Sequence, residues 1–116
     1  MTRRHQRMDV WKLGMELVER LYKTTAQFPN SERFGLISQM RRCVVSIPSN
    51  IAEGAARGSD KEFNRFLLIA RGSLAELETQ LEIARRLNYI GNDASQAELV
   101  EHLYAKLNNL IRSLTT

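Results

Sequence analysis

Apolar side chains recur every three or four residues in four successive blocks of this chain. Such spacing gathers them on one face of an α-helix, and no stretch shows the sustained alternation of apolar and polar residues typical of a β-strand. The blocks run from Asp9 to Phe28, from Ser31 to about Arg57, from Ser59 to about Asn88, and from Ser95 to the end of the chain. Four amphipathic helices joined by short connections predict an all-α fold, an up-down-up-down four-helix bundle.

Local signals predict where these helices begin and end. Asp9 is expected to be the N-cap of the first helix, and Ser59 and Ser95 each open a Ser-x-x-Glu capping box. Gly91 is expected to stop the third helix. Pro48 falls inside the apolar pattern of the second block, which continues beyond it, so a kink of the second helix at Pro48 is predicted.

Length and composition narrow the class of protein. A chain of 116 residues is enough for one domain, and we expect residues 1–8 to be a basic, flexible N-terminus and residues 9–116 to form a single domain. No apolar run approaches the ~20 residues of a membrane span, and the basic first residues lead into no apolar segment of a secretory signal. The single cysteine fits a reducing compartment. We therefore expect a cytoplasmic protein with no membrane partner.

The second helix is apolar on more than one side. Beyond its main stripe, small and apolar residues extend nearly halfway round the helix, and a helix with two apolar sides usually has two partners. The third helix repeats this more weakly at Leu68, Ile69, Ala75 and Ile83. We predict a homo-oligomer that uses these two helices, although single exposed apolar residues are normal on any surface. The predicted interface residues are Val45, Ser46, Pro48, Ser49, Asn50, Ala52, Glu53 and Ala56.

Two glycines fall inside predicted helices. Gly54 and Gly72 each cost about 1 kcal/mol relative to alanine in a helix interior. Close approach between helices would explain either glycine, and a merely tolerated glycine is an equal alternative.

No group of residues has the arrangement of a catalytic or metal site. Neither His5 nor His102 stands beside an array of Cys, Asp or Glu at metal-ligand spacing. Cys43 falls on the core stripe of the second helix, where a thiol behaves as a small hydrophobe. We therefore expect no enzyme activity, no cofactor and no metal.

The basic residues say more about function than the candidate catalytic residues do. From Arg33 to Arg71 there are seven of them against three acidic residues, and 13 of the 17 cations in the chain are arginine, the side chain suited to bidentate phosphate contact. An alternative is a solvated face with Arg–Glu pairs between subunits, which we favour slightly for Arg42, Glu53 and Arg57. The candidate nucleic-acid-binding residues are Arg41, Arg42, Arg57, Lys61 and Arg65.

The run from Ser46 to Gly54, Ser-Ile-Pro-Ser-Asn-Ile-Ala-Glu-Gly, is distinctive. With Gly72-Ser73-Leu74 and the segment from Glu76 to Leu81, it closely resembles the family of 23S rRNA intervening-sequence proteins. The resemblance implies a bacterial four-helix bundle that forms rings, expected to be pentamers, without an established activity. A similar fold serves as the accessory protein of diversity-generating retroelements, a basic barrel that engages nucleic acid and a reverse transcriptase. By this resemblance, the positions expected to matter are Arg41, Arg42, Ser46, Ser49, Asn50, Glu53 and Arg57.

One departure from the family pattern is visible. Ala55 and Ala56 follow Gly54, where family members often carry an aromatic residue, so a stacking role at this point is not expected here.

Two functions fit these observations. The first is a non-catalytic, ring-like homo-oligomer that binds rRNA, another structured RNA or a ribonucleoprotein through a repeated basic surface. The second is a protein–protein interaction scaffold that makes no direct contact with nucleic acid.

Overall fold

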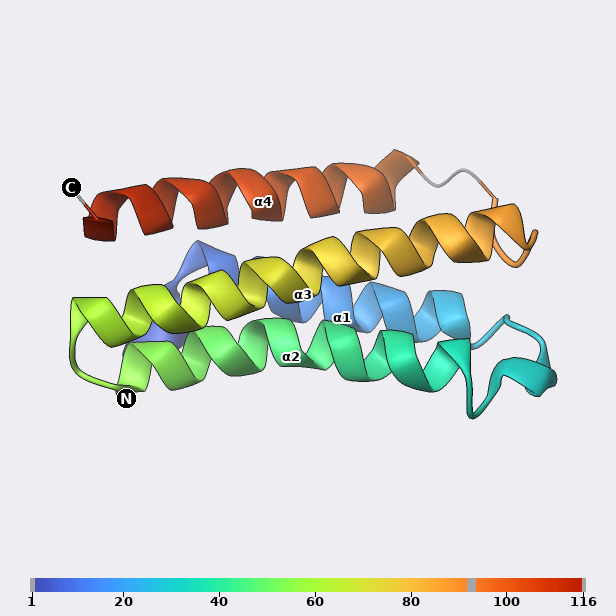
Figure 1. Ribbon diagram of the computed structural model, residues 1–116, viewed down its shortest axis with the longest axis horizontal. Helices are drawn as coiled ribbons and strands as arrows, with labels where there is room; N and C mark the ends of the chain where they lie inside the picture. Colours follow the sequence, from blue (N-terminus) through green and yellow to red (C-terminus); the bar gives the residue numbers. More distant parts are fainter. Residues whose placement is uncertain (1, 92–93, 116) are drawn as a thin grey trace.

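A computed structural model describes residues 2–91 and 94–115. Within these ranges the chain forms four α-helices, two short 3-10 helices and no strand. The α-helices alternate in direction along a bundle of 43 × 23 × 23 Å (Figure 1), which confirms the predicted all-α four-helix bundle. The elements are η1 (Arg4–Arg7), α1 (Asp9–Thr25), η2 (Asn30–Glu32), α2 (Leu36–Ala56), α3 (Asp60–Arg86) and α4 (Ala94–Thr115).

The helices surround one apolar core. Figure 1 shows α2 below α3, with α1 behind them and α4 above, and α2 makes its closest contacts with α3 and then with α1. Both chain termini lie at the end of the bundle where α2 connects to α3, which we call the α2–α3 end. The predicted apolar stripes face inward, and the fully buried side chains include Leu17, Leu21, Met40, Ile47, Ile51, Leu67, Leu74, Leu77, Leu103 and Leu107.

The helix starts agree with the sequence at one of three predicted caps. Ser59 is the N-cap of α3, and its hydroxyl accepts a hydrogen bond from the Glu62 backbone N–H at 3.2 Å. The prediction for Asp9 is wrong by one residue, because Met8 is the N-cap of α1. The prediction for Ser95 is also wrong: it lies inside α4, where its hydroxyl accepts from Arg20 at 3.2 Å.

Local hydrogen bonds displace two further boundaries. The second helix begins at Leu36, not Ser31, because η2 comes first and a Glu32 carboxylate oxygen accepts from the Leu36 N–H at 3.2 Å. The predicted stop at Gly91 is wrong, since α3 ends at Arg86 and Asn88 takes the left-handed conformation with φ +63. Asparagine tolerates this conformation better than most residues.

Pro48 and the two helical glycines have distinct surroundings. The predicted kink at Pro48 is not shown: α2 is a single α-helix throughout, and Pro48 is buried against Gly14 of α1. A Cβ on Gly54 would stand 2.6 Å from the Phe66 Cβ, so close approach of α2 and α3 is confirmed there. A Cβ on Gly72 would meet nothing within 4 Å, so close approach does not explain that glycine.

The N-terminal segment contains an element that the sequence pattern did not predict. Arg4–Arg7 forms η1, which contacts both α1 and α2. Its Arg4 guanidinium lies 4.9 Å from the centre of the Phe63 ring, so this segment reaches the start of α3.

Among residues 2–91 and 94–115, none of the helices combines the length and apolarity needed to span a membrane.

Candidate functional site

The structure divides the predicted nucleic-acid-binding residues into two groups. Arg57, Lys61 and Arg65 lie together at the α2–α3 end, around the turn that joins the two helices. Arg41 and Arg42 lie on α2 far from this turn, about 24 Å along the helix at 1.5 Å per residue. The five residues therefore do not form one continuous site.

Arginines at the α2–α3 end stack on aromatic rings. The guanidinium carbons of Arg57 and Arg65 lie 4.9 and 4.6 Å from the centre of the Phe66 ring. Arg4 makes the equivalent contact with Phe63 at 4.9 Å. Both rings are buried, as the sequence predicts for core residues. Cation–π contact helps to hold these guanidinium groups in place at the surface.

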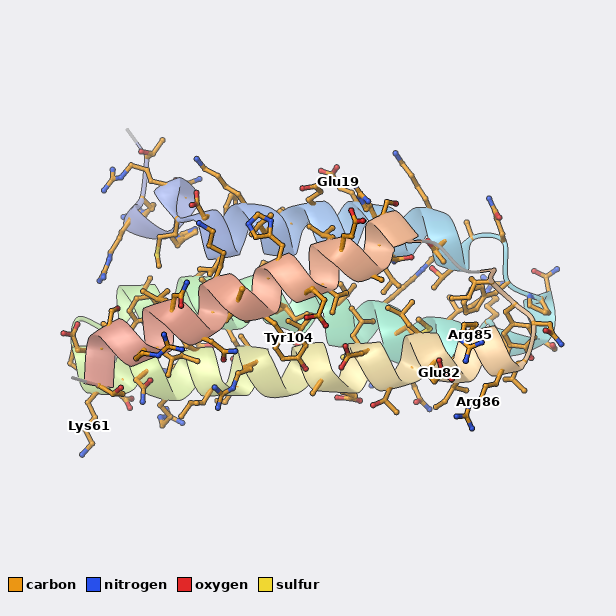
Figure 2. The ribbon with its side chains drawn as sticks, turned by 90° about the horizontal axis from the view of Figure 1, so that it is seen from above. Glu19, Lys61, Glu82, Arg85, Arg86 and Tyr104 are labelled. Carbon is orange, nitrogen blue, oxygen red and sulfur yellow. The ribbon has the colours of Figure 1, made fainter. Side chains whose placement is uncertain are left out.

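Carboxylates pair with only some of these cations. Glu53 accepts from Arg57 at 3.0 Å, and Glu62 holds Arg65 through two hydrogen bonds of 2.9 and 3.3 Å. The bond from Arg65 is the main reason that the pKa of Glu62 is lowered, and the same bond raises the pKa of Arg65. Lys61 projects away from the bundle (Figure 2) and has no ion-pair partner among the described residues. We call Arg4, Arg57, Lys61 and Arg65 the basic cluster.

Arg41 has a structural role within the chain. Its Nε donates to the Thr25 hydroxyl at 2.9 Å, a terminal nitrogen donates to the Tyr22 carbonyl at 3.2 Å, and the guanidinium stacks on the Tyr22 ring at 4.5 Å. These contacts fasten the last turn of α1 to α2. Arg42 is exposed and makes no ion pair within residues 2–91 and 94–115.

The predicted interface residues also fall into two groups, those with contacts inside the chain and those that face solvent. The Ser46 hydroxyl contacts the Ser73 hydroxyl of α3 at 2.8 Å, so Ser46 lies at the α2–α3 contact. The Asn50 amide donates to the Ser46 carbonyl at 2.7 Å within α2. Pro48 is buried by the chain itself. The exposed residues of this set are Val45, Ser49, Glu53 and Ala56, and the half-buried ones are Ser46, Asn50 and Ala52.

An apolar groove of ≈ 370 Å³ runs between α1 and α2. Four of the predicted interface residues line it from α2, namely Val45, Pro48, Ser49 and Ala52. The other wall consists of Trp11, Met15 and Val18 of α1, a contribution that the sequence analysis missed. Their spacing of four and three residues is a helical signal, but only the pairing of α1 with α2 brings the two walls together. We call this feature the α1–α2 groove.

A second cavity, of ≈ 360 Å³, lies between α3 and α4 toward the opposite end. Three of the residues that line it are the acids Glu78, Glu82 and Glu101. Hydrogen bonds from Arg85, and then from Arg86, lower the pKa of Glu82 to about 2, so it stays ionised. Figure 2 shows Glu82, Arg85 and Arg86 far from Lys61, toward the other end of the bundle. Arg85 also lines this cavity, so its lining carries charges of both signs, in contrast to the α2–α3 end where Lys61 has no acidic partner among the described residues.

Cys43 is buried, as predicted for a core thiol. Its sulfur donates to the Ser73 carbonyl at 3.0 Å, and burial, with a smaller effect of Glu76, raises its pKa to about 12. A thiol that remains protonated at neutral pH is a poor nucleophile. Within the described ranges, no three His, Cys, Asp or Glu side chains are grouped so as to hold a metal ion.

Comparison with protein families matches residues 6–116 to the 23S rRNA-intervening sequence proteins. The chain belongs to this family. The resemblance predicted from the Ser46–Gly54 run is thereby confirmed. A solved structure of an S23 ribosomal family protein of unknown function from Bacteroides thetaiotaomicron is similar, with 26% identity and a TM-score of 0.63, over 90% of this chain and 94% of that one. No curated protein matches the chain.

In this 23S rRNA-intervening sequence protein, the Ser46–Gly54 run serves the fold of the single chain at several positions. Ser46 bonds to α3, Pro48 packs on Gly14, and Gly54 lets Phe66 approach. Ser49 and Ala52 line the open α1–α2 groove beside Pro48.

Proposed function

We propose that this 23S rRNA-intervening sequence protein is a non-catalytic, cytoplasmic homo-oligomer that binds structured RNA or ribonucleoprotein. Its copies form a ring, a pentamer, and each copy presents its basic cluster. A few phosphate contacts per copy bind weakly, but a ring multiplies them and so raises the total affinity.

The observation that carries this proposal is the basic cluster itself. Arg4 and Arg57 come from segments far apart in the sequence, yet each stacks on a phenylalanine near the start of α3. Lys61 lies in the first turn of α3 with no carboxylate partner among the described residues. Exposed guanidinium and ammonium groups held at one end of a rigid bundle are suited to phosphate groups.

The test uses two matched double variants. Arg4→Glu with Lys61→Glu reverses two charges in the basic cluster. Lys23→Glu with Arg33→Glu makes the same charge change near the opposite end, where Arg33 also stacks on a phenylalanine, Phe34, at 5.3 Å. Circular dichroism first establishes that both variants fold.

Electrophoretic mobility shifts with 23S rRNA fragments then compare their affinities. We expect the wild type to bind with a steep dependence on salt, and the variant of the basic cluster to bind about tenfold more weakly or worse, with a shallower salt slope. The control variant should bind within about threefold of the wild type. Absence of binding by the wild type at low salt, or equal losses in both variants, would contradict the proposal.

A second candidate function is a protein–protein interaction scaffold without nucleic-acid contact. Phe34 favours it, because this large side chain is 87% exposed in the connection between η2 and α2. Solvent-facing aromatic residues often anchor protein interfaces. A partner that stays bound after nuclease treatment, and is lost on Phe34→Ser, would favour this function over RNA binding.

A further inference from the structure

We propose that neighbouring copies pair head to tail, with the outer face of α3 of one copy seated in the α1–α2 groove of the next. This inference rests on the proposed homo-oligomer and assigns its contact surfaces. It adds α1 to the interface, and it makes the two contacting surfaces different from one another.

The groove has the form of a docking site for a helix. Its walls follow the same spacing on two antiparallel helices, Trp11, Met15 and Val18 on α1 and Val45, Ser49 and Ala52 on α2. Met15 and Val45 are 38% and 40% exposed, which is high for apolar side chains along one continuous groove. An apolar groove between two helices can receive the apolar face of a third helix.

The outer face of α3 has the matching shape. Leu68 and Ile83 are 41% and 43% exposed and stand at the two ends of this face. Between them lie the exposed small residues Gly72 and Ala75, and a Cβ at Gly72 would meet nothing within 4 Å. Because the side chains between these two apolar ends are small, the backbone of α3 can approach the floor of a shallow groove closely.

The two surfaces lie at the same level along the bundle. The hydrogen bond between Ser46 and Ser73 fixes the register of α2 against α3. Val45 and Gly72 each directly precede one of these serines. The α1–α2 groove and the outer face of α3 therefore lie at nearly the same level along the bundle. A closed ring with its axis along the bundle relates copies by rotation alone, and it therefore requires contact surfaces at equal heights.

Charges beside the two surfaces are complementary. Arg42 precedes Val45 by one helical turn and makes no ion pair among the described residues. Glu76 follows Gly72 by one turn, and its carboxylate contacts two uncharged groups, the Gln80 amide at 3.3 Å and the Cys43 thiol, without forming an ion pair in the described part of the chain. Both charges lie at the level of Cys43, which directly follows Arg42 and feels the charge of Glu76. Arg42 of one copy is thereby placed to pair with Glu76 of the next.

The positions of the helices favour a ring. Viewed from above, α1 and α3 lie on opposite sides of the bundle (Figure 2). A contact between two different surfaces on different sides of each copy is heterologous, and it produces a closed ring when the rotation closes. An isologous dimer would instead bring one surface against itself.

Cysteine cross-linking between separate variants distinguishes these arrangements. We expect Val45→Cys protein mixed with Gly72→Cys protein to form a disulfide-linked dimer on mild oxidation, whereas neither variant does so alone. Ala75→Cys, one turn further along α3, should also link to Val45→Cys. Ala105→Cys, exposed on α4, is the control and should link to neither. The native Cys43 contributes little background because it is buried.

Charge reversal provides a second readout that does not depend on cysteine. Arg42→Glu and Glu76→Arg should each weaken association about tenfold, and the double variant should recover most of that loss. Linking of Val45→Cys to itself, no link in the mixture, or no recovery in the double variant would overturn the inference. If one of these results is obtained and the wild-type protein is an oligomer, only the proposed pairing of the two surfaces is wrong. A wild type that remains a single copy would overturn the proposed assembly as well.

Discussion

The inward and outward sides of α2 differ in how far the rest of the chain buries their side chains. On the inward side, Val44, Ile47 and Ile51 are fully buried against the other helices. On the outward side, Val45 is 40% exposed and lines, with Ser49, a groove that the described residues leave open. Packing within the single chain accounts for these inward residues of α2. Its outward residues are therefore the ones that remain for contact between molecules.

The largest expected effect on folding comes from placing a carboxylate on the inward side of α2, in comparison with a carboxylate on its outward side. Ile47→Asp buries a carboxylate without a partner and should cost more than about 4 kcal/mol of the free energy of unfolding, enough to unfold the chain. Val45→Asp, two residues away, should keep the helix content and lose association. Circular dichroism and light scattering on both variants measure this, and a folded Ile47→Asp protein would refute the assignment of the two sides.

Arg41 and Arg42 offer a smaller contrast between adjacent residues. Arg41→Glu removes the hydrogen bonds to Thr25 and Tyr22, and it should lower the free energy of unfolding by about 2 kcal/mol. Arg42→Glu should change it by less than about 0.5 kcal/mol, because that side chain is exposed. Urea unfolding at protein concentrations that separate the copies makes the comparison. Equal losses in the two variants would show that Arg41 does not fasten α1 to α2.

Alanine substitutions at the two helical glycines have the smallest expected effects on the free energy of unfolding, and the two effects differ in sign. Gly54→Ala places a methyl group 2.6 Å from the Phe66 Cβ, and the overpacking should outweigh the gain in helix propensity, with a net loss of about 1 kcal/mol. Gly72→Ala meets no neighbour within its own chain and should gain up to about 1 kcal/mol at protein concentrations that separate the copies. Thermal unfolding of the two variants checks the signs. Stabilisation by both would mean that α2 and α3 are not held in close contact at Gly54.

The fold was predictable because it follows from short-range patterns. Helical spacing placed Leu17, Ile47 and Leu74 in the core, and the Ser59 capping box marked the start of α3. Boundaries were less predictable where two local signals compete. Asn88, not Gly91, takes the left-handed position, since the Tyr89 N–H reaches the Ala84 carbonyl at 2.9 Å and closes α3 there.

The candidate site was predictable only in part, because it depends on which helices become neighbours. Sequence reasoning found Arg57, Lys61 and Arg65, which are close in the chain. It did not find that Arg4 stacks on Phe63, nor that Met15 faces Val45 across a groove. These contacts join segments that only the folded bundle brings together.

The mass of the protein in solution tests the central claim most directly, because both the repeated basic cluster and the head-to-tail contact require several copies. Multi-angle light scattering at micromolar concentration should give a mass of about five times the 13.3 kDa chain, unchanged on moderate dilution. A stable mass equal to one chain would contradict the account.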